Sequence, residues 1–109
     1  MKFSIKKQEH GTVVSLRGDI MSFEPEFREA LINTVQDGKN PIVLDLEKVK
    51  FVNASGLGVF LQCHILAKKA GRSLRIANAP EKVLSLFVIT KFSSVFQIFD
   101  SVEKALNAA

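Results

Sequence analysis

The stretch that decides the fold covers residues 42–60 and reads IVLDLEKVKFVNASGLGVF. Together with Pro41 it opens on a nearly continuous apolar run at 41–46, which is typical of a short strand buried on both faces of a sheet. Apolar residues then recur at helical spacing, which predicts a helix over about 55–70. Gly71 closes this helix, as glycine often does just past a helix end. The stretch therefore predicts a buried strand that passes through a tight turn into a helix.

Outward from this unit, strands and helices alternate along the chain. Apolar residues at period two predict strands at about 2–8 and 12–18, joined by a turn at Glu9-His10-Gly11. A helical pattern with Pro25 in its first turn predicts a helix at about 23–37. The same criteria predict strands at 73–77 and 95–99 and helices at about 80–89 and 101–108, the last capped by Asp100. This order predicts a single α/β domain with a four- or five-stranded mixed sheet and about four helices.

The helical patterns also predict which side chains face the sheet. The residues expected to pack there are Phe27, Leu31, Leu57, Phe60 and Leu61. At the end of the 55–70 helix, Lys68, Lys69 and Arg72 place positive charge where the helix dipole favours cations.

Length and composition limit the class of protein. The chain has 109 residues, of which 47% are apolar and 24% charged, which is enough for one domain over residues 1–109 with one core. A single cysteine, Cys63, excludes a disulfide scaffold, and with His10 and His64 it cannot supply the four ligands of a structural metal site. No apolar run is long enough to span a membrane, and residues 1–7 do not resemble a signal peptide, so we expect a cytoplasmic protein without membrane insertion.

The formal net charge of +4 raises the question of nucleic-acid binding. However, 15 basic residues face 11 acidic ones, and the chain has neither Trp nor Tyr to stack on bases. Its nine Phe residues mostly lie at spacings typical of a core. The pattern therefore argues against a nucleic-acid-binding domain.

The residue pattern also argues against an enzyme. His10 and His64 lie far apart in the sequence, and neither is next to a candidate nucleophile. Cys63 falls in the middle of a predicted helix, where nothing local lowers the pKa of its thiol, so we interpret it as a small core residue. Gly56-Leu57-Gly58 lacks the third glycine of a dinucleotide-binding loop. We therefore expect no catalytic residue, cofactor or metal.

The most informative position is the turn before the 55–70 helix. Asn53 is a good N-cap candidate, and the first amide groups of a helix have no partner within the helix itself. Small residues at Ala54, Ser55, Gly56 and Gly58 leave room for another surface. A phosphate on a side chain here would meet free amides and the positive end of the helix dipole.

Residues 42–60 resemble the central motif of the STAS domain, in particular of free-standing bacterial anti-sigma factor antagonists. Gly18-Asp19-Ile20 and the strand after Gly71 match the same family in order, so the resemblance covers nearly the whole chain. It implies a non-catalytic protein that binds a histidine-kinase-like anti-sigma factor or switch kinase and so releases a sigma factor. In that family the kinase phosphorylates a serine at the start of the second helix, and a PP2C-type phosphatase removes the phosphate.

The sequence departs from the family pattern at the phosphorylated position. Aligned on Gly56-Leu57-Gly58, Asn53 replaces the family's Asp, and Ala54, whether natural or engineered, replaces the phosphoacceptor serine. Ser55 matches the hydroxyl residue that follows the acceptor. Two hypotheses stay open: the protein is not phosphorylated at the usual position and binds constitutively or by another signal, or Ser55 is the phosphoacceptor.

The resemblance leaves a choice of function. The first is a partner-switching regulator that binds through Asn53, Ala54, Ser55, Gly56, Leu57 and Gly58. The alternative is a STAS subunit of a transport assembly, such as a lipid-transport ABC complex. For the first, we expect Ser55→Glu or Gly56→Asp to weaken docking and leave the fold intact.

Overall fold

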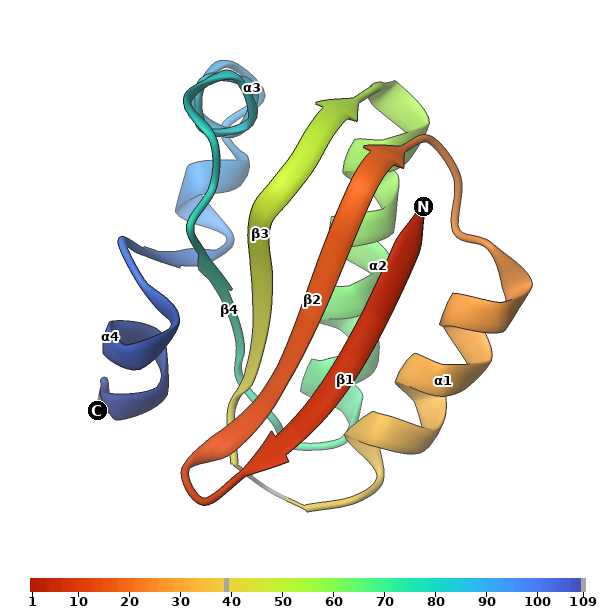
Figure 1. Ribbon diagram of the computed structural model, residues 1–109, viewed down its shortest axis with the longest axis vertical. Coiled ribbons are helices and arrows are strands. Elements are labelled where there is room, and N and C mark those ends of the chain that lie inside the picture. Colours follow the sequence, from red (N-terminus) through yellow and green to blue (C-terminus); the bar gives the residue numbers. More distant parts are fainter. Residues whose placement is uncertain (39, 109) are drawn as a thin grey trace.

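The computed structural model describes residues 1–38 and 40–108 and contains one five-stranded sheet. The elements are β1 (Lys2–Gln8), β2 (Gly11–Ile20), α1 (Pro25–Val35), β3 (Ile42–Val52), α2 (Ala54–Lys69), β4 (Leu74–Ala77), α3 (Glu81–Ile89), η1 (Phe92–Ser94), β5 (Gln97–Phe99) and α4 (Val102–Asn107). The spatial order is β1-β2-β3-β4-β5 (Figure 1). β1 is antiparallel to β2 and the other pairs are parallel, which confirms the predicted mixed α/β sheet.

The two faces of the sheet are covered differently. α1 and α2 lie together behind the sheet in Figure 1, over apolar side chains such as Leu16, Leu44 and Ile76. On the opposite face, α4 packs on β3 and β4 through a small cluster around Val43 and Ala105. Among the described elements, no helix covers the part of that face formed by β1, β2 and the second half of β3 (Figure 1).

Phenylalanine rings form the centre of the core under the helices. Phe27, Phe60 and Phe87 are fully buried, and the rings of Phe60 and Phe87 meet edge to face with centroids 5.3 Å apart. The predicted inward positions of Phe27, Leu31 and Phe60 are therefore confirmed, and Leu57 is half-buried.

The predicted inward position of Leu61 is wrong, because 37% of this residue is exposed. The buried residues of α2 are Gly56, Val59, Phe60, Cys63 and Ala67. These residues form the buried side of the helix, and residue 61 does not lie on that side. The close contact of Gly56 with the sheet fixes the rotation of the helix about its axis. Leu61 is left on the solvent side.

Two strands are longer than predicted. β2 continues through Gly18 to Ile20, and β3 continues from 46 to Val52, because the two extensions pair with each other. The pairing has irregularities between Ser15 and Arg17 and between Gly18 and Asp19. Gly18 has a φ of +86°, a value that glycine adopts without strain. These irregularities hide the alternation of apolar residues from a sequence pattern.

The C-terminal elements have bounds and a capping residue that differ from the predicted ones. β5 is shorter than the predicted 95–99 strand and covers only Gln97–Phe99. Asp100 does not cap α4; instead, the hydroxyl of Ser101 accepts the amide of Lys104 at 3.1 Å. In the described part of the chain, no helix is long and apolar enough to cross a bilayer.

Arg72 holds the loop around residue 37 rather than acting as a surface charge at the end of α2, which corrects its expected role. Its residue exposure is only 4%, and its guanidinium donates to the carbonyl oxygens of Thr34 at 2.6 Å and Asn40 at 2.7 Å. It also donates to the hydroxyl of Thr12 at 3.2 Å. Burial lowers the pKa of Arg72, and the nearby Asp37 carboxylate partly opposes this. These bonds tie α1, β2 and the end of α2 together.

Candidate functional site

The candidate site is the start of α2, which we call the α2 turn and define as residues 53–58. β3 ends at the buried Val52 and passes directly into Asn53, the N-cap of α2. The Oδ1 atom of Asn53 accepts the amide of Gly56 at 2.8 Å, and its carbonyl accepts the amide of Leu57 at 3.0 Å. The predicted capping role of Asn53 is confirmed. The backbone amide of Asn53 also donates to the carbonyl oxygen of Ile20 at 3.4 Å, which joins the turn to the end of β2.

The cap leaves two amides of the first turn open. Among the described residues, we find no acceptor for the backbone amides of Ala54 and Ser55. Both residues are exposed. The first turn of α2 contains no acidic side chain to offset the positive end of the helix dipole. The turn can therefore accept a negatively charged group at its outer side.

Gly56 and Gly58 have opposite environments although they are two residues apart. A Cβ atom on Gly56 would lie 1.9 Å from the carbonyl oxygen of Ile20 and 3.0 Å from a side-chain carbon of Val52. Gly56 is buried and places α2 directly on the end of β2. At Gly58, a Cβ atom would meet nothing within 4 Å. The expectation that Gly56→Asp leaves the fold intact is therefore wrong, because no side chain fits there.

The outer side of α2 carries exposed apolar side chains next to the exposed, polar Gln62. Leu61 and Ile65 are 37% and 43% exposed, and the half-buried Leu57 lies one turn earlier on the same side. No charged residue occurs in α2 before Lys68. Beside the turn, Phe51 is 53% exposed. It lines a groove of about 300 Å³ together with Lys50, Val52, Lys82, Val83 and Leu86.

The remaining candidate residues have structural surroundings. Cys63 is fully buried, and this burial raises the pKa of its thiol to about 12, so it is a core residue as predicted. His64 is half-buried and meets the ring of Phe96 edge to face at 5.7 Å. His10 lies in the exposed turn between β1 and β2. Within residues 1–38 and 40–108, no group of three His, Cys, Asp or Glu side chains is placed to hold a metal ion.

Two features of this surface were not predicted from the sequence. One is the continuation of β3 to Val52, which places Phe51 just before the turn and Lys48 and Lys50 on the strand that leads into it. The other is the contact of Gly56 with Ile20. The only sequence signal for the contact was the presence of a glycine where a helix leaves a buried strand.

Comparison with known proteins identifies relatives across almost the whole chain. Residues 2–105 match the family model described as the STAS domain. A protein of Bacillus subtilis named "Anti-sigma-B factor antagonist" is 30% identical over 95 residues, which are 86% of each chain. A Staphylococcus aureus protein of the same name is 28% identical over 72% of this chain and 73% of its own.

A solved structure has the same fold. It is an anti-sigma-factor antagonist (STAS) domain protein from Planctomyces limnophilus, which superposes with a TM-score of 0.80 at 16% identity. The match covers 95% of this chain and 94% of that one. The predicted fold class is confirmed by this likeness.

Proposed function

Because the chain belongs to the STAS domain family, we propose that it is a non-catalytic partner-switching regulator that binds a kinase-type anti-sigma factor or a related switch kinase. The observation that carries the proposal is the α2 turn, capped from within by Asn53 but open outward at Ala54 and Ser55. The names of the curated relatives support the same general role. Such a regulator acts in the cytoplasm, where transcription takes place.

The surface around the turn suits a protein partner. Leu61 and Ile65 expose apolar surface along α2, and Phe51 adds an exposed ring beside its start. Clustered apolar surface of this kind is typical of protein interaction sites. Ala54 and Gly58 have small side chains or none, so a partner can approach the backbone of the turn closely. We therefore propose that residues 53–58, apart from the buried Gly56, and the outer side of α2 form the docking surface.

The same geometry supports control by phosphorylation at Ser55. A phosphate on Ser55 would lie beside the unpartnered amides of the first turn and the positive end of the helix dipole. It would add about −1.5 to −2 charges to an apolar docking surface, which opposes binding. Ala54 supports the other hypothesis, constitutive binding, because it lacks the hydroxyl that the family uses. A PP2C-type phosphatase is a second partner only if Ser55 is phosphorylated.

Affinity capture followed by calorimetry tests the proposal. The wild-type chain is used to capture its partner from cells of the source organism, and the purified partner is then titrated with variants. We expect Ser55→Glu to weaken binding about tenfold or more, because the new charge must be desolvated against the partner. Ser93→Glu is the matched control, since Ser93 is exposed in η1 and outside α2. Equal affinity for both variants contradicts the proposed docking surface, and capture of a transport ATPase favours the alternative function.

Intact-mass spectrometry distinguishes the two hypotheses on phosphorylation. The chain is incubated with the captured kinase and ATP, and the mass is compared with that of Ser55→Ala. A gain of one phosphate that is lost in Ser55→Ala assigns the switch to Ser55. No gain in the wild-type chain supports constitutive binding.

A further inference from the structure

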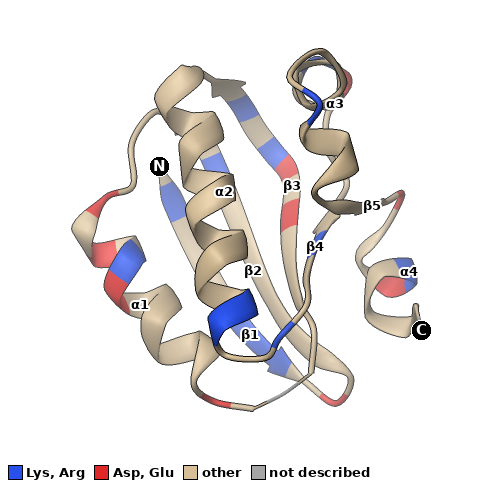
Figure 2. Ribbon diagram, turned by 180° about the vertical axis from the view of Figure 1, so that it is seen from behind, with Lys and Arg blue, Asp and Glu red and all other residues tan. Residues whose placement is uncertain are grey.

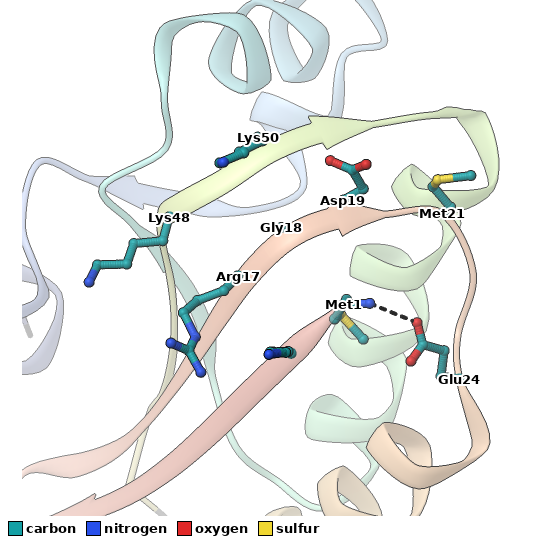
Figure 3. A pocket seen from close by; sticks show the side chains of 9 residues that line it. Met1, Arg17, Gly18, Asp19, Met21, Glu24, Lys48 and Lys50 are labelled. Atoms are coloured by element: carbon teal, nitrogen blue, oxygen red, sulfur yellow. Dashed lines mark hydrogen bonds and ion pairs between the residues drawn. The ribbon is translucent and has the colours of Figure 1, made fainter.

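A basic hollow lies on the helix-free part of the sheet, at the same end of the molecule as the α2 turn. Four basic side chains line it: Lys2 from β1, Arg17 from β2, and Lys48 and Lys50 from β3. Figure 3 labels Arg17, Lys48 and Lys50. All four residues are exposed, and the hollow has a volume of about 830 Å³. We call this region the basic hollow.

The register of the strands places three of these charges side by side. Lys2 is directly opposite Arg17, and Arg17 is directly opposite Lys48, so like charges form a row across three strands. Like charges at directly opposite positions destabilise a sheet. The row therefore opposes folding, which suggests that it serves a purpose other than stability.

The row forms no ion pairs among the described residues, although Asp45 and Glu47 line an adjacent depression together with Arg17 and Lys48. Within the described residues, no carboxylate lies within ion-pair distance of Lys2, Arg17, Lys48 or Lys50. The carboxylate of Glu24, which also lines the hollow, is paired with the amino group of residue 1 at 3.0 Å (Figure 3). Asp19 is the remaining acidic residue among those lining the hollow. The hollow is thus a net positive surface that an anionic group would neutralise.

The shape and the neighbours of the hollow indicate what kind of anion fits. It is a broad, open depression, and the 49% exposed Met21 adds apolar surface to its lining. Lys50 also lines the groove beside Phe51, so the hollow is continuous with the surface next to the α2 turn. An extended segment carrying acidic and apolar side chains matches these features.

We propose that the basic hollow binds an acidic segment of the same protein partner that docks on the α2 turn. This inference rests on the proposed function and adds the chemistry of the partner's second contact. The charges raise the rate of encounter with an acidic partner, and the hollow selects between partners that share the contact with the turn.

A peptide titration tests the hollow without the natural partner. The probe is the capped synthetic peptide Glu-Leu-Glu-Glu-Leu-Glu, and its control is the same peptide with every Glu replaced by Gln. Amide chemical shifts of the ¹⁵N-labelled chain are followed by NMR. We expect shifts at the amides of Lys2, Arg17, Lys48 and Lys50 with the acidic peptide only. Binding should weaken about fivefold when the ionic strength is raised from about 0.01 M to 0.1 M.

Matched variants distinguish the effect of this hollow on peptide binding from the effect of the protein's overall positive charge. Lys48→Gln/Lys50→Gln and Lys68→Gln/Lys69→Gln remove the same charge, but Lys68 and Lys69 lie at the far end of α2 (Figure 2). We expect the first pair to weaken peptide binding about tenfold and the second to leave it unchanged. Lys48→Arg/Lys50→Arg should restore it.

Three outcomes overturn the inference. They are an equal loss in both Gln pairs, tighter binding of inorganic tripolyphosphate than of the peptide at the same amides, and tighter binding of anionic lipid vesicles. The last two would assign the hollow to a small anion or to a membrane surface. Retention of the wild-type amide spectrum and melting temperature in the Gln variants shows that they are folded.

Binding of the variants to the captured partner distinguishes failure of this inference from failure of the proposed function. If Ser55→Glu weakens binding and Lys48→Gln/Lys50→Gln does not, the docking surface stands and the inference on the hollow is wrong. If only the lysine variant weakens binding, the hollow stands and the assignment of the α2 turn is wrong.

Discussion

The two sides of α2 share one sequence but have opposite relations to the rest of the molecule. On the inner side, Gly56 and Phe60 are packed so closely that the helix touches the backbone of β2. On the outer side, a Cβ atom on Gly58 would meet no described atom within 4 Å, and Leu61 is 37% exposed. Neighbouring residues of one short motif therefore have different roles. One set packs the helix against the sheet, and the other leaves its outer surface exposed.

The largest effect is expected from filling the inner side at Gly56. Gly56→Ala should destabilise the fold by about 5 kcal/mol, because its Cβ would lie 1.9 Å from a backbone carbonyl oxygen and α2 must move away from β2. Urea unfolding followed by circular dichroism measures the change. A destabilisation below about 1 kcal/mol would show that α2 moves freely at this end, and the division between the two sides would fail.

The next effect compares two adjacent side chains. Phe60→Ala should cost about 3–5 kcal/mol, since it removes a fully buried ring that packs on Phe87. Leu61→Ala is the matched variant and should cost less than about 1 kcal/mol, because the residue is 37% exposed. Urea midpoints of the two variants give the comparison directly. Similar costs would mean that the helix is rotated relative to the structure.

A smaller effect concerns the pH dependence of stability. The pKa of Cys63 is raised from 9.0 to about 12 by burial, so the folded state keeps the proton that the unfolded state loses. This contribution is fully present below pH 9 and is lost as the pH rises toward 12, and the part lost by pH 10 is roughly 1 kcal/mol.

Cys63→Ala is the control for this pH effect, because it removes the titrating thiol. The unfolding free energy of the wild-type chain should fall by roughly 1 kcal/mol relative to that of Cys63→Ala from pH 8 to pH 10. Chemical denaturation at the two pH values measures it. A constant difference would show that the thiol ionises equally in both states and is not enclosed by the core.

The sequence predicted what depends on local pattern and missed what depends on pairing between distant segments. The α/β order, the α2 turn and the Asn53 cap follow from spacing and residue type over a few positions. The extension of β3 to Val52 was missed because Glu47, Lys48 and Lys50 interrupt the apolar run, and only the pairing with β2 shows that the strand continues. Arg72 was assigned to the helix dipole, since nothing in the sequence shows that carbonyl groups of residues 34 and 40 surround it.

The same distinction applies to the surfaces proposed for binding. The open α2 turn could be located from small residues and a capping residue in one stretch. The basic hollow could not, because Lys2, Arg17 and Lys48 become neighbours only through the register of three strands. The error at Leu61 has a related cause: residues 57, 60 and 61 form as plausible a helical face as 59, 60 and 63. The contact between Gly56 and Ile20 decides between them.

The smallest expected effect on stability is at Gly58, on the outer side. Gly58→Ala should stabilise the fold by about 0.5–1 kcal/mol, because alanine favours a helix and its Cβ meets nothing within 4 Å. Thermal unfolding measures this gain in stability. Its sign is opposite to that of the change expected for Gly56→Ala on the inner side. If the open side is the docking surface, the same methyl group should weaken binding of the captured partner in calorimetry while the protein becomes more stable. A stabilised variant with unchanged affinity would place the closest approach of the partner away from Gly58.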